Sequence, residues 1–355
     1  MKKKSHKYHE YLKRRQRLIE KQRSKEKNRK IAPNLPLLES EFRKEDEEKD
    51  STVYFVPDDF SIYRNSDIVI TFFHDVRTYI LKPPINKNIH FNFSEVKHLT
   101  VDALMYLLAI IKNLDPTHKY VRKYSGGMPS NEEAKELFVN SGFLRYVRSK
   151  IKRLEHKSNC VQIATNSVVK RTVAKNIVEF IRKNDSNVDQ STTSAIYEMI
   201  IELETNTHDH ASKMSDNDIE KLDWLAYAED AGDFFRFTFL DTGIGICRTI
   251  KRNWFEGLDK KRSDPTYLMD ALKGELPSST KMKNRGNGLP TILGYAVSGL
   301  IERFTIITNQ AYCYYNPESN DIVSRPINKS IWGTVYYWEL SKNKQPRKRV
   351  ENNAY

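Results

Sequence analysis

Cysteine and long apolar runs are scarce in this sequence. Its 355 residues contain only three cysteines, Cys160, Cys247 and Cys313, which are widely spaced, so neither a disulfide framework nor a zinc site is expected. The longest apolar run, Ala103 to Ile111, has nine residues, whereas a membrane-spanning helix needs about 20. The basic N-terminus lacks the apolar segment of a secretory signal. These absences predict a cytoplasmic protein that does not cross a membrane.

The positive charge is concentrated at the two ends of the chain. Residues 1–30 contain 14 Lys and Arg against three Glu, and residues 31–50 contain seven acidic residues against three basic ones. We interpret 1–50 as a basic arm followed by an acidic linker, and 343–355 as a basic tail. The arm is either a solvated extension or a segment that binds nucleic acid through counterion release.

The chain between these ends has the composition of a folded protein. Its 19 Tyr and 16 Phe exclude a disordered chain, and the length suggests two domains. Residues 52–150 predict an α/β domain in which strands alternate with helices. A Ser130/Glu133 capping box opens the second of these helices. The expected strands are 52–56, 67–73, 88–93 and 119–124, and the first helix is 101–114.

In this order of elements, residues 52–150 resemble the STAS domain, a small α/β module of anti-sigma-factor antagonists. The resemblance rests on the strand ending at Phe93, the following loop and helix, and the later Ser141-Gly-Phe-Leu144. It implies a surface for a protein partner. In such antagonists a phosphorylatable Ser opens the first helix. Asp102 stands at this position and cannot accept phosphate as Ser does, whereas Thr100 is a second candidate acceptor that is also placed to cap the helix.

Residues 160–342 contain four segments that together indicate nucleotide chemistry. In the first, Ile196 to Ala211, Glu202 and Asn206 are four residues apart and leave the same face of a helix. A carboxylate and an amide oxygen on one face suit water activation beside a hydrated Mg²⁺. By itself such a pair is usually part of a solvated helix surface. We interpret the nearby His208 and His210 as surrounding residues and not as metal ligands.

The second segment is a β-prone run, Phe234 to Asp241, that is followed by Gly243 and Gly245. Asp241 can accept a hydrogen bond from an exocyclic amine such as adenine N6, and the same carboxylate would reject the oxygen of guanine. The two glycines would let the backbone approach a flat base. Considered alone, this pattern is an ordinary glycine turn after a strand.

The third and fourth segments complete the pattern. Gly286 and Gly288 precede a helix that has Pro290 in its first turn, where backbone amides are well placed to hold phosphates. Gly333 and Thr334 enter a final strand, and Thr334 either hydrogen-bonds near the base or belongs to a β-turn. Each of these two segments is weak evidence alone.

In their order and spacing the four segments resemble the N, G1, G2 and G3 boxes of the GHKL ATP-binding fold of gyrase, heat-shock chaperones, histidine kinases and MutL. The resemblance implies an α+β two-layer sandwich over 160–342 that binds ATP and Mg²⁺. Glu202 matches the catalytic general base, Asn206 the Mg²⁺ ligand, and residues 247–285 the lid over the phosphates. The nucleotide-binding residues that it implies are Asn206, Asp241, Gly243, Gly245, Ile246, Gly286, Asn287, Gly288, Leu289 and Thr334.

Three functions are compatible with this layout. The first is a Mg-dependent ATPase that acts as a nucleotide-controlled conformational switch for a protein partner bound by the STAS-like domain. The second is a serine/threonine protein kinase resembling the anti-sigma-factor kinases. The third is a regulatory scaffold that binds nucleic acid through the arm 1–30. Because GHKL proteins often dimerise on ATP binding, the resemblance also allows a homodimer.

Overall fold

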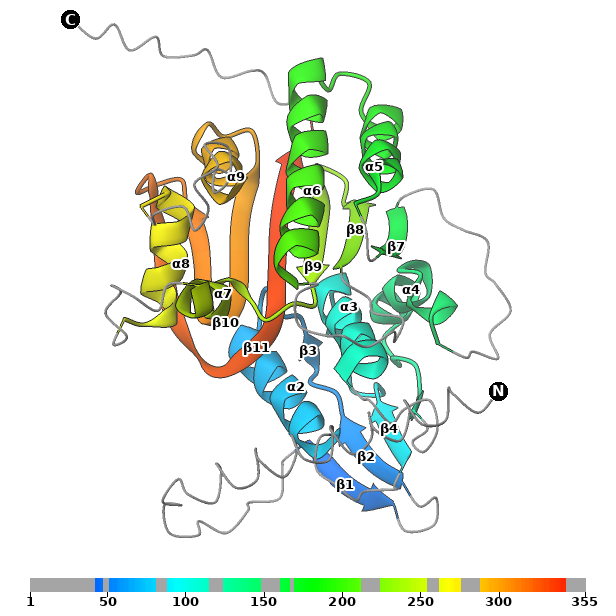
Figure 1. Ribbon diagram of the computed structural model, residues 1–355. Coiled ribbons are helices and arrows are strands. Elements are labelled where there is room, and N and C mark those ends of the chain that lie inside the picture. The colour runs from blue at the N-terminus through cyan, green and yellow to red at the C-terminus, as the bar shows by residue number, and fades with distance from the viewer. Residues whose placement is uncertain are drawn as a thin grey trace, which may run out of the picture. The chain divides into compact units, whose positions relative to one another are not determined.

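The computed structural model describes nine stretches of the chain, all within one compact unit that covers Phe42–Tyr355. These stretches are residues 42–46, 51–80, 88–114, 124–147, 160–166, 169–211, 224–253, 262–275 and 288–342. The expected basic arm and basic tail lie outside the described residues. Helices and strands alternate, so the chain is an α/β protein (Figure 1).

A four-stranded sheet forms the first half, in the order β1-β2-β4-β6. The strands β2, β4 and β6 are parallel, and β1 pairs with β2 in the antiparallel sense. Their bounds are β1 Arg43–Asp46, β2 Ser51–Phe55, β4 Asn88–Asn92 and β6 Tyr124–Gly126. The short parallel strands β3 Asp59–Phe60 and β5 His98–Leu99 form a separate pair. Strand β1 lies inside the range 31–50 that we interpreted as a linker.

The helices of this half follow the parallel strands. They are α2 Ser66–Ile80, α3 Val101–Ala109, which continues into the π-helical turn Ile110–Leu114, and α4 Glu132–Asn140, followed by the 3₁₀ turn Phe143–Arg145. The helix expected at 101–114 is therefore confirmed. Of the strand expected at 119–124, only Tyr124 is within the described residues.

Two local predictions for this half are wrong. The expected strand 67–73 is the helix α2, because its buried positions Val69, Phe73, Val76 and Ile80 recur at the three-to-four-residue spacing of a helix. Helix α4 begins one residue later than the Ser130 capping box predicts. Its N-cap is Asn131, whose side chain accepts a hydrogen bond from the Ala134 N–H at 3.0 Å.

The start of α3 also differs in detail from the prediction. Thr100 occupies the N-cap position but makes no side-chain capping bond; its hydroxyl donates to the Asp102 carboxylate instead. That carboxylate is buried and accepts the backbone N–H groups of Tyr63 and Ala103, both at 2.8 Å. Burial raises the pKa of Asp102. Asp102 therefore acts as a structural link to the loop that precedes α2.

A five-stranded antiparallel sheet forms the second half, in the order β10-β11-β9-β8-β7. The expected helix at 196–211 and the expected strand at 234–241 are both present. The strands are β7 Cys160–Asn166, β8 Trp224–Asp230, β9 Phe234–Asp241, β10 Glu302–Asn316 and β11 Asp321–Ser341. The helices are α5 Arg171–Asn184, α6 Gln190–Ala211, α7 Ile246–Asn253, α8 Asp264–Lys273 and α9 Gly288–Val297.

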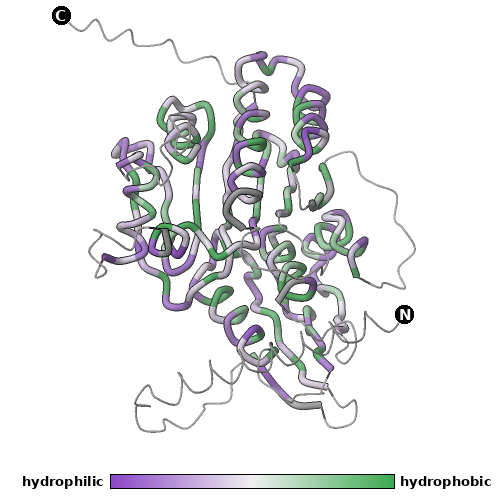
Figure 2. The backbone as a smooth tube through the Cα atoms, viewed as in Figure 1, coloured by the Kyte–Doolittle hydropathy of each residue, from purple (hydrophilic) through white to green (hydrophobic). Residues whose placement is uncertain are grey.

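Both faces of this sheet are covered by helices. On one face Phe237, Phe239 and Trp338 pack in a cluster with residues of α5, α6, α8 and α9. On the other face Leu240 and Val335 belong to a second cluster, which also contains residues of α2 and α3. Figure 1 shows α6 in front of β9, and Figure 2 shows hydrophilic and hydrophobic residues interleaved along α5 and α6. Double coverage explains why β9 carries buried apolar side chains on both faces, Phe237 and Phe239 on one and Leu240 on the other.

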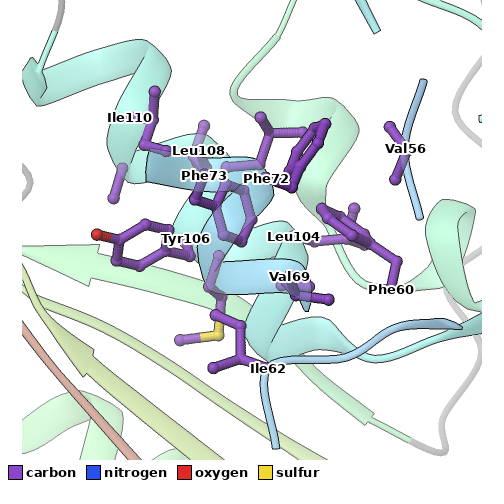
Figure 3. Close-up of a cluster of buried hydrophobic side chains, with 14 of the residues drawn as sticks. Val56, Phe60, Ile62, Val69, Phe72, Phe73, Leu104, Tyr106, Leu108 and Ile110 are labelled. Atoms are coloured by element: carbon purple, nitrogen blue, oxygen red, sulfur yellow. The ribbon is translucent and has the colours of Figure 1, made fainter. Parts of the chain in front are cut away.

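The second cluster is dominated by aromatic and aliphatic residues of the first half (Figure 3). Phe73 of α2 and Tyr106 of α3 have ring centroids 4.7 Å apart. The Tyr106 hydroxyl accepts the backbone N–H of Trp332 in β11 at 2.8 Å. The two sheets therefore share one apolar core. Within the described residues, no helix is both long enough and apolar enough to cross a membrane.

The stack of Trp338 on Phe237 should be a major source of stability. Trp338 is 1% exposed and its ring lies 5.2 Å from that of Phe237. Replacing Trp338 by Ala should lower the free energy of unfolding by about 3–5 kcal/mol, because it leaves a large cavity. Trp338→Phe should cost less, because the buried indole N–H has no hydrogen-bond partner among the described residues.

Urea unfolding of these variants measures the effect. The exposed control Val297→Ala, at a side chain that is 49% exposed, should change the free energy of unfolding by less than about 0.5 kcal/mol. Equal losses for Trp338→Ala and Val297→Ala would contradict the assigned packing.

Candidate functional site

Asp241 ends strand β9, where three strands meet. It pairs in register with Thr334 of β11 and with Trp224 of β8. Its Oδ1 accepts the backbone N–H of Gly243 at 2.9 Å. Burial raises the pKa of the Asp241 carboxyl to about 6, although hydrogen bonds from Thr334 and Gly243 favour the ionised form. The carboxylate is thus held by hydrogen bonds in a poorly hydrated place.

Gly333 brings β11 close to this carboxylate. Its φ of +79° lies in the left-handed region that favours glycine. A Cβ added at Gly333 would also overlap the backbone carbonyl oxygen of Asp241. Any side chain at this position would therefore push β11 away from β9 and separate Thr334 from Asp241.

Gly245 is required for a reason that differs from our expectation. Its φ is +88°, and an added Cβ would lie 2.6 Å from the Asn309 side-chain amide and 2.7 Å from the Thr308 hydroxyl. The glycine therefore makes room for two side chains of β10, whereas the sequence suggested room for a flat base. Its neighbour Ile246 begins α7.

Thr308 and Asn309 are site residues that the sequence analysis missed. The Thr308 hydroxyl accepts the Ile246 N–H at 3.0 Å and donates to the Gly333 carbonyl at 3.1 Å. The Asn309 side chain accepts the Arg248 N–H at 3.1 Å and donates to the Ile244 carbonyl at 2.8 Å. Both residues are buried. The sequence did offer a signal for them, since these two polar residues directly follow the apolar Ile306-Ile307 in a strand.

Glu202 and Gly288 form the second part of the site. Glu202 lies on α6 and is half-buried, and Gly288 is the first residue of α9. A Cβ added at Gly288 would overlap the Glu202 carboxylate. The neighbouring Leu289 packs against the apolar cluster on this face of the sheet. Gly286 and Asn287 lie outside the described residues.

Tyr336 of β11 interacts electrostatically with a carboxylate of each part of the site. It is 3% exposed, and its pKa is raised well above the usual value, first by burial and then by the negative charges of Asp241 and Glu202. Both carboxylates are therefore near enough to the same buried phenol to interact with it electrostatically. The structure thus brings Glu202 to Gly288 and Asp241 to Thr334, residues that are spread over more than 130 positions of the sequence.

Asn206 is one helical turn after Glu202 and is half-buried. The described residues contain no cluster of three or more His, Cys, Asp or Glu that could hold a metal ion. A magnesium ion at this site would therefore depend on Asn206, on water and on oxygens of a ligand, which suits its preference for oxygen and for retained waters. The side chains of His208 and His210 are outside the described part of the structure.

The described part of the expected lid, 247–285, consists of α7 and α8. Cys247 and Tyr267 are buried against the sheet, and the Lys251 ammonium forms an ion pair with Asp264. Lys251 is thereby already partnered within the fold. The remaining residues of the range, 254–261 and 276–285, lie outside the described residues.

Glu204 is a second buried acid on α6, close in sequence to Glu202. It is fully buried, and one of its oxygens accepts the backbone N–H of Lys170 at 2.5 Å, next to the start of α5. Burial raises its pKa to about 7. Its contact with Lys170 gives Glu204 a structural role at the start of α5, whereas Glu202 faces Gly288.

Comparison with known proteins assigns no function to these residues. No protein-family model matches the chain, and no curated protein matches its sequence. The function must therefore be argued from the residues of the site themselves.

Two glycines of α9 provide a matched test of the Glu202–Gly288 contact. Gly288→Ala should lower the free energy of unfolding by about 1–3 kcal/mol, because the new methyl group displaces the Glu202 side chain. Gly294→Ala should be neutral or stabilising by up to about 1 kcal/mol, because an added Cβ meets nothing within 4 Å and Ala favours a helix. Chemical denaturation of both variants measures the difference, and equal effects would contradict the contact.

The raised pKa of Asp241 predicts a pH dependence of stability. The folded state holds the Asp241 proton more tightly than the unfolded chain does, so this group favours folding at low pH. That contribution is lost as the pH rises from about 4 to about 6. The stability of Asp241→Asn relative to wild type should therefore increase over this range and level off above it. Urea unfolding at pH 4, 5, 6 and 7 tests this; a constant difference would refute the raised pKa.

Proposed function

We propose that this protein binds ATP as a member of the GHKL superfamily and is a Mg-dependent ATPase that works as a nucleotide-controlled switch. The observation that carries the proposal is the approach of Glu202 on α6 to Gly288 at the start of α9, together with the contact of Asp241 with Thr334 in the sheet that these helices cover. Both carboxylates interact electrostatically with Tyr336. The two parts supply a base-reading carboxylate and a water-activating carboxylate in one site.

Asp241 would read the adenine base. Its ionised carboxylate accepts a hydrogen bond from the exocyclic amine, and the same group disfavours guanine, which presents an oxygen there. Thr334 and Gly243 already hydrogen-bond the carboxylate and hold it in place. Because protonation weakens the carboxyl group as an acceptor, binding through this group should strengthen as the pH rises through about 6.

Glu202 would act as the general base on the attacking water. Its carboxylate faces Gly288 at the N-terminus of α9, where backbone N–H groups favour an anion such as a phosphate. Asn206 would hold the magnesium ion from the same face of α6. The bound Mg²⁺ supplies electrostatic stabilisation of the phosphate charge. On this proposal Glu202 would lie where the phosphate, the metal and the attacking water meet.

The first half, which we propose is STAS-like, would transmit the nucleotide state to a protein partner. Tyr106 of α3 accepts the Trp332 N–H two residues before Thr334. Burial raises the pKa of Tyr106 to about 12, and the negative charge of Asp241 contributes to that rise. Tyr106 thereby links a helix of the first half to the strand segment that carries Thr334.

The environment of Asp102 argues against phosphorylation at the acceptor position of the STAS-like half. Asp102, at the acceptor position of the STAS-like half, is buried and accepts two backbone N–H groups. A protein kinase acting on a separate substrate remains our second candidate. Nucleic-acid binding by the arm 1–30 and dimerisation on ATP binding also stay predictions.

The fate of the γ-phosphate of ATP tests the proposal. With γ-labelled Mg-ATP, the wild-type protein should release free phosphate. Glu202→Gln should slow the release by about 10²–10⁴, because the variant lacks the general base. Glu198→Gln is the matched control: Glu198 lies one turn earlier on α6 and also contacts α9, through a 3.0 Å hydrogen bond from the Tyr295 hydroxyl. It should keep the wild-type rate within about twofold.

Two results would change the conclusion. Hydrolysis by Glu202→Gln at the wild-type rate would remove the assigned base. Label retained on the protein or on a partner would replace the ATPase with the kinase.

A further inference from the structure

Two arginines from separate helices meet at the indole ring of Trp332. The guanidinium carbon of Arg77, on α2, lies 4.2 Å from the ring centroid, and that of Arg248, on α7, lies 5.3 Å from it. The Trp332 backbone N–H is held by Tyr106, and the ring packs against the apolar cluster beneath α2 and α3. Both guanidinium groups thus make cation–π contacts with the same indole ring.

The charges of these arginines are not neutralised within the described part of the chain. Arg77 Nε is buried and has no hydrogen-bond partner there. Arg248 donates one hydrogen bond, of 3.2 Å, to the uncharged Ser330 hydroxyl. Neither guanidinium forms an ion pair with a described carboxylate. The pKa of Arg77 is lowered, mainly by burial, with the charge of Arg248 contributing and Tyr106 opposing.

Two more basic side chains adjoin the pair. His74, one turn before Arg77 on α2, has a lowered pKa because of burial and because of the positive charges of Lys329 and Arg77; the Asp75 carboxylate opposes this effect. Lys329 belongs to β11 and is exposed. Arg77 and Arg248 meet at Trp332, and Lys329 is near enough to α2 to act on His74. Like charges in close proximity are costly unless an anion balances them.

A third arginine next to α2, Arg325, has a carboxylate partner, in contrast to Arg77 and Arg248. Arg325 of β11 also contacts α2, but it pairs with the Asp67 carboxylate at 3.0 Å and with the Ser66 hydroxyl at 2.7 Å. The fold therefore supplies a carboxylate to Arg325 and, within the described residues, none to Arg77 and Arg248.

We propose that Arg77 and Arg248 form a binding site for a phosphate group. A guanidinium offers its N–H donors in a fixed fork that matches the oxygens of phosphate, and two guanidinium groups can hold one tetrahedral anion. Lys329 adds positive charge nearby, whereas the lowered pKa of His74 favours its neutral form. Such a site goes beyond the proposed ATPase activity, and its binding of inorganic phosphate can be measured without ATP hydrolysis.

The phosphate comes from one of two sources, free inorganic phosphate or the phosphate chain of a nucleotide. In either case the ligand lies beside Trp332, which directly precedes Gly333. Because Gly333 packs on the Asp241 backbone, occupation of the site would act on the strand segment that holds Thr334 against Asp241.

Isothermal titration of the full chain with inorganic phosphate, at constant ionic strength, tests the proposal. Wild type should bind, and Arg77→Gln and Arg248→Gln should each weaken binding about tenfold or more, since each loses a charged hydrogen-bonding group. Arg325→Gln is the control for general damage next to α2 and should bind phosphate as wild type does. If thermal unfolding shows that Arg77→Gln does not fold, Arg248→Gln and Arg77→Lys provide the test.

A second titration, with a saturating non-hydrolysable Mg-ATP analogue, separates the sources. Phosphate that still binds identifies the free anion as the ligand. If the analogue blocks phosphate, and both arginine variants also weaken the analogue, the ligand is the phosphate chain of the nucleotide. Either result supports the site. Absence of phosphate binding to wild type at 10 mM, on the order of the weakest useful affinity, or equal binding by wild type and both arginine variants, would overturn it.

Discussion

The close approach of Gly333 to the backbone of Asp241 is the constraint on which the site depends. Because a glycine with positive φ lets β11 come near the end of β9, Thr334 reaches the Asp241 carboxylate, and Thr308 can bond both the Gly333 carbonyl and the start of α7. One backbone contact thus holds the proposed base-reading group, the neighbouring strand and the first helix of the expected lid together.

Helices cover both faces of the five-stranded sheet that contains this contact. Helices α6 and α9 bring Glu202 and Gly288 to one face, while α2 and α3 of the first half pack on the other. Tyr106 and Trp332 join the second face to the strand that carries Thr334. The proposed nucleotide site and the proposed phosphate site therefore lie along one strand, β11. A ligand at either site can act on the same segment of backbone.

Local patterns in the sequence predicted much of the fold. The helix carrying Glu202, strand β9 and the helix after Gly288 follow from periodicity, β-propensity and a proline in the first turn. Helix α2 was mistaken for a strand because Asp67 to Phe73 is rich in β-branched and aromatic residues, which is also true of a helix buried in an aromatic core. Tertiary packing overrode local propensity there.

The sequence by itself determined the chemistry available to the protein: an acid after a β-run, an acid and an amide on one helix face, and glycines before a helix. Only the tertiary structure decided which of these meet, because contacts such as Glu202 with Gly288 join residues that are far apart in the chain. It also showed that Gly245 accommodates Thr308 and Asn309, and that Arg77 and Arg248 share Trp332. Such long-range packing leaves no periodic trace in a single sequence, so no local pattern could predict it.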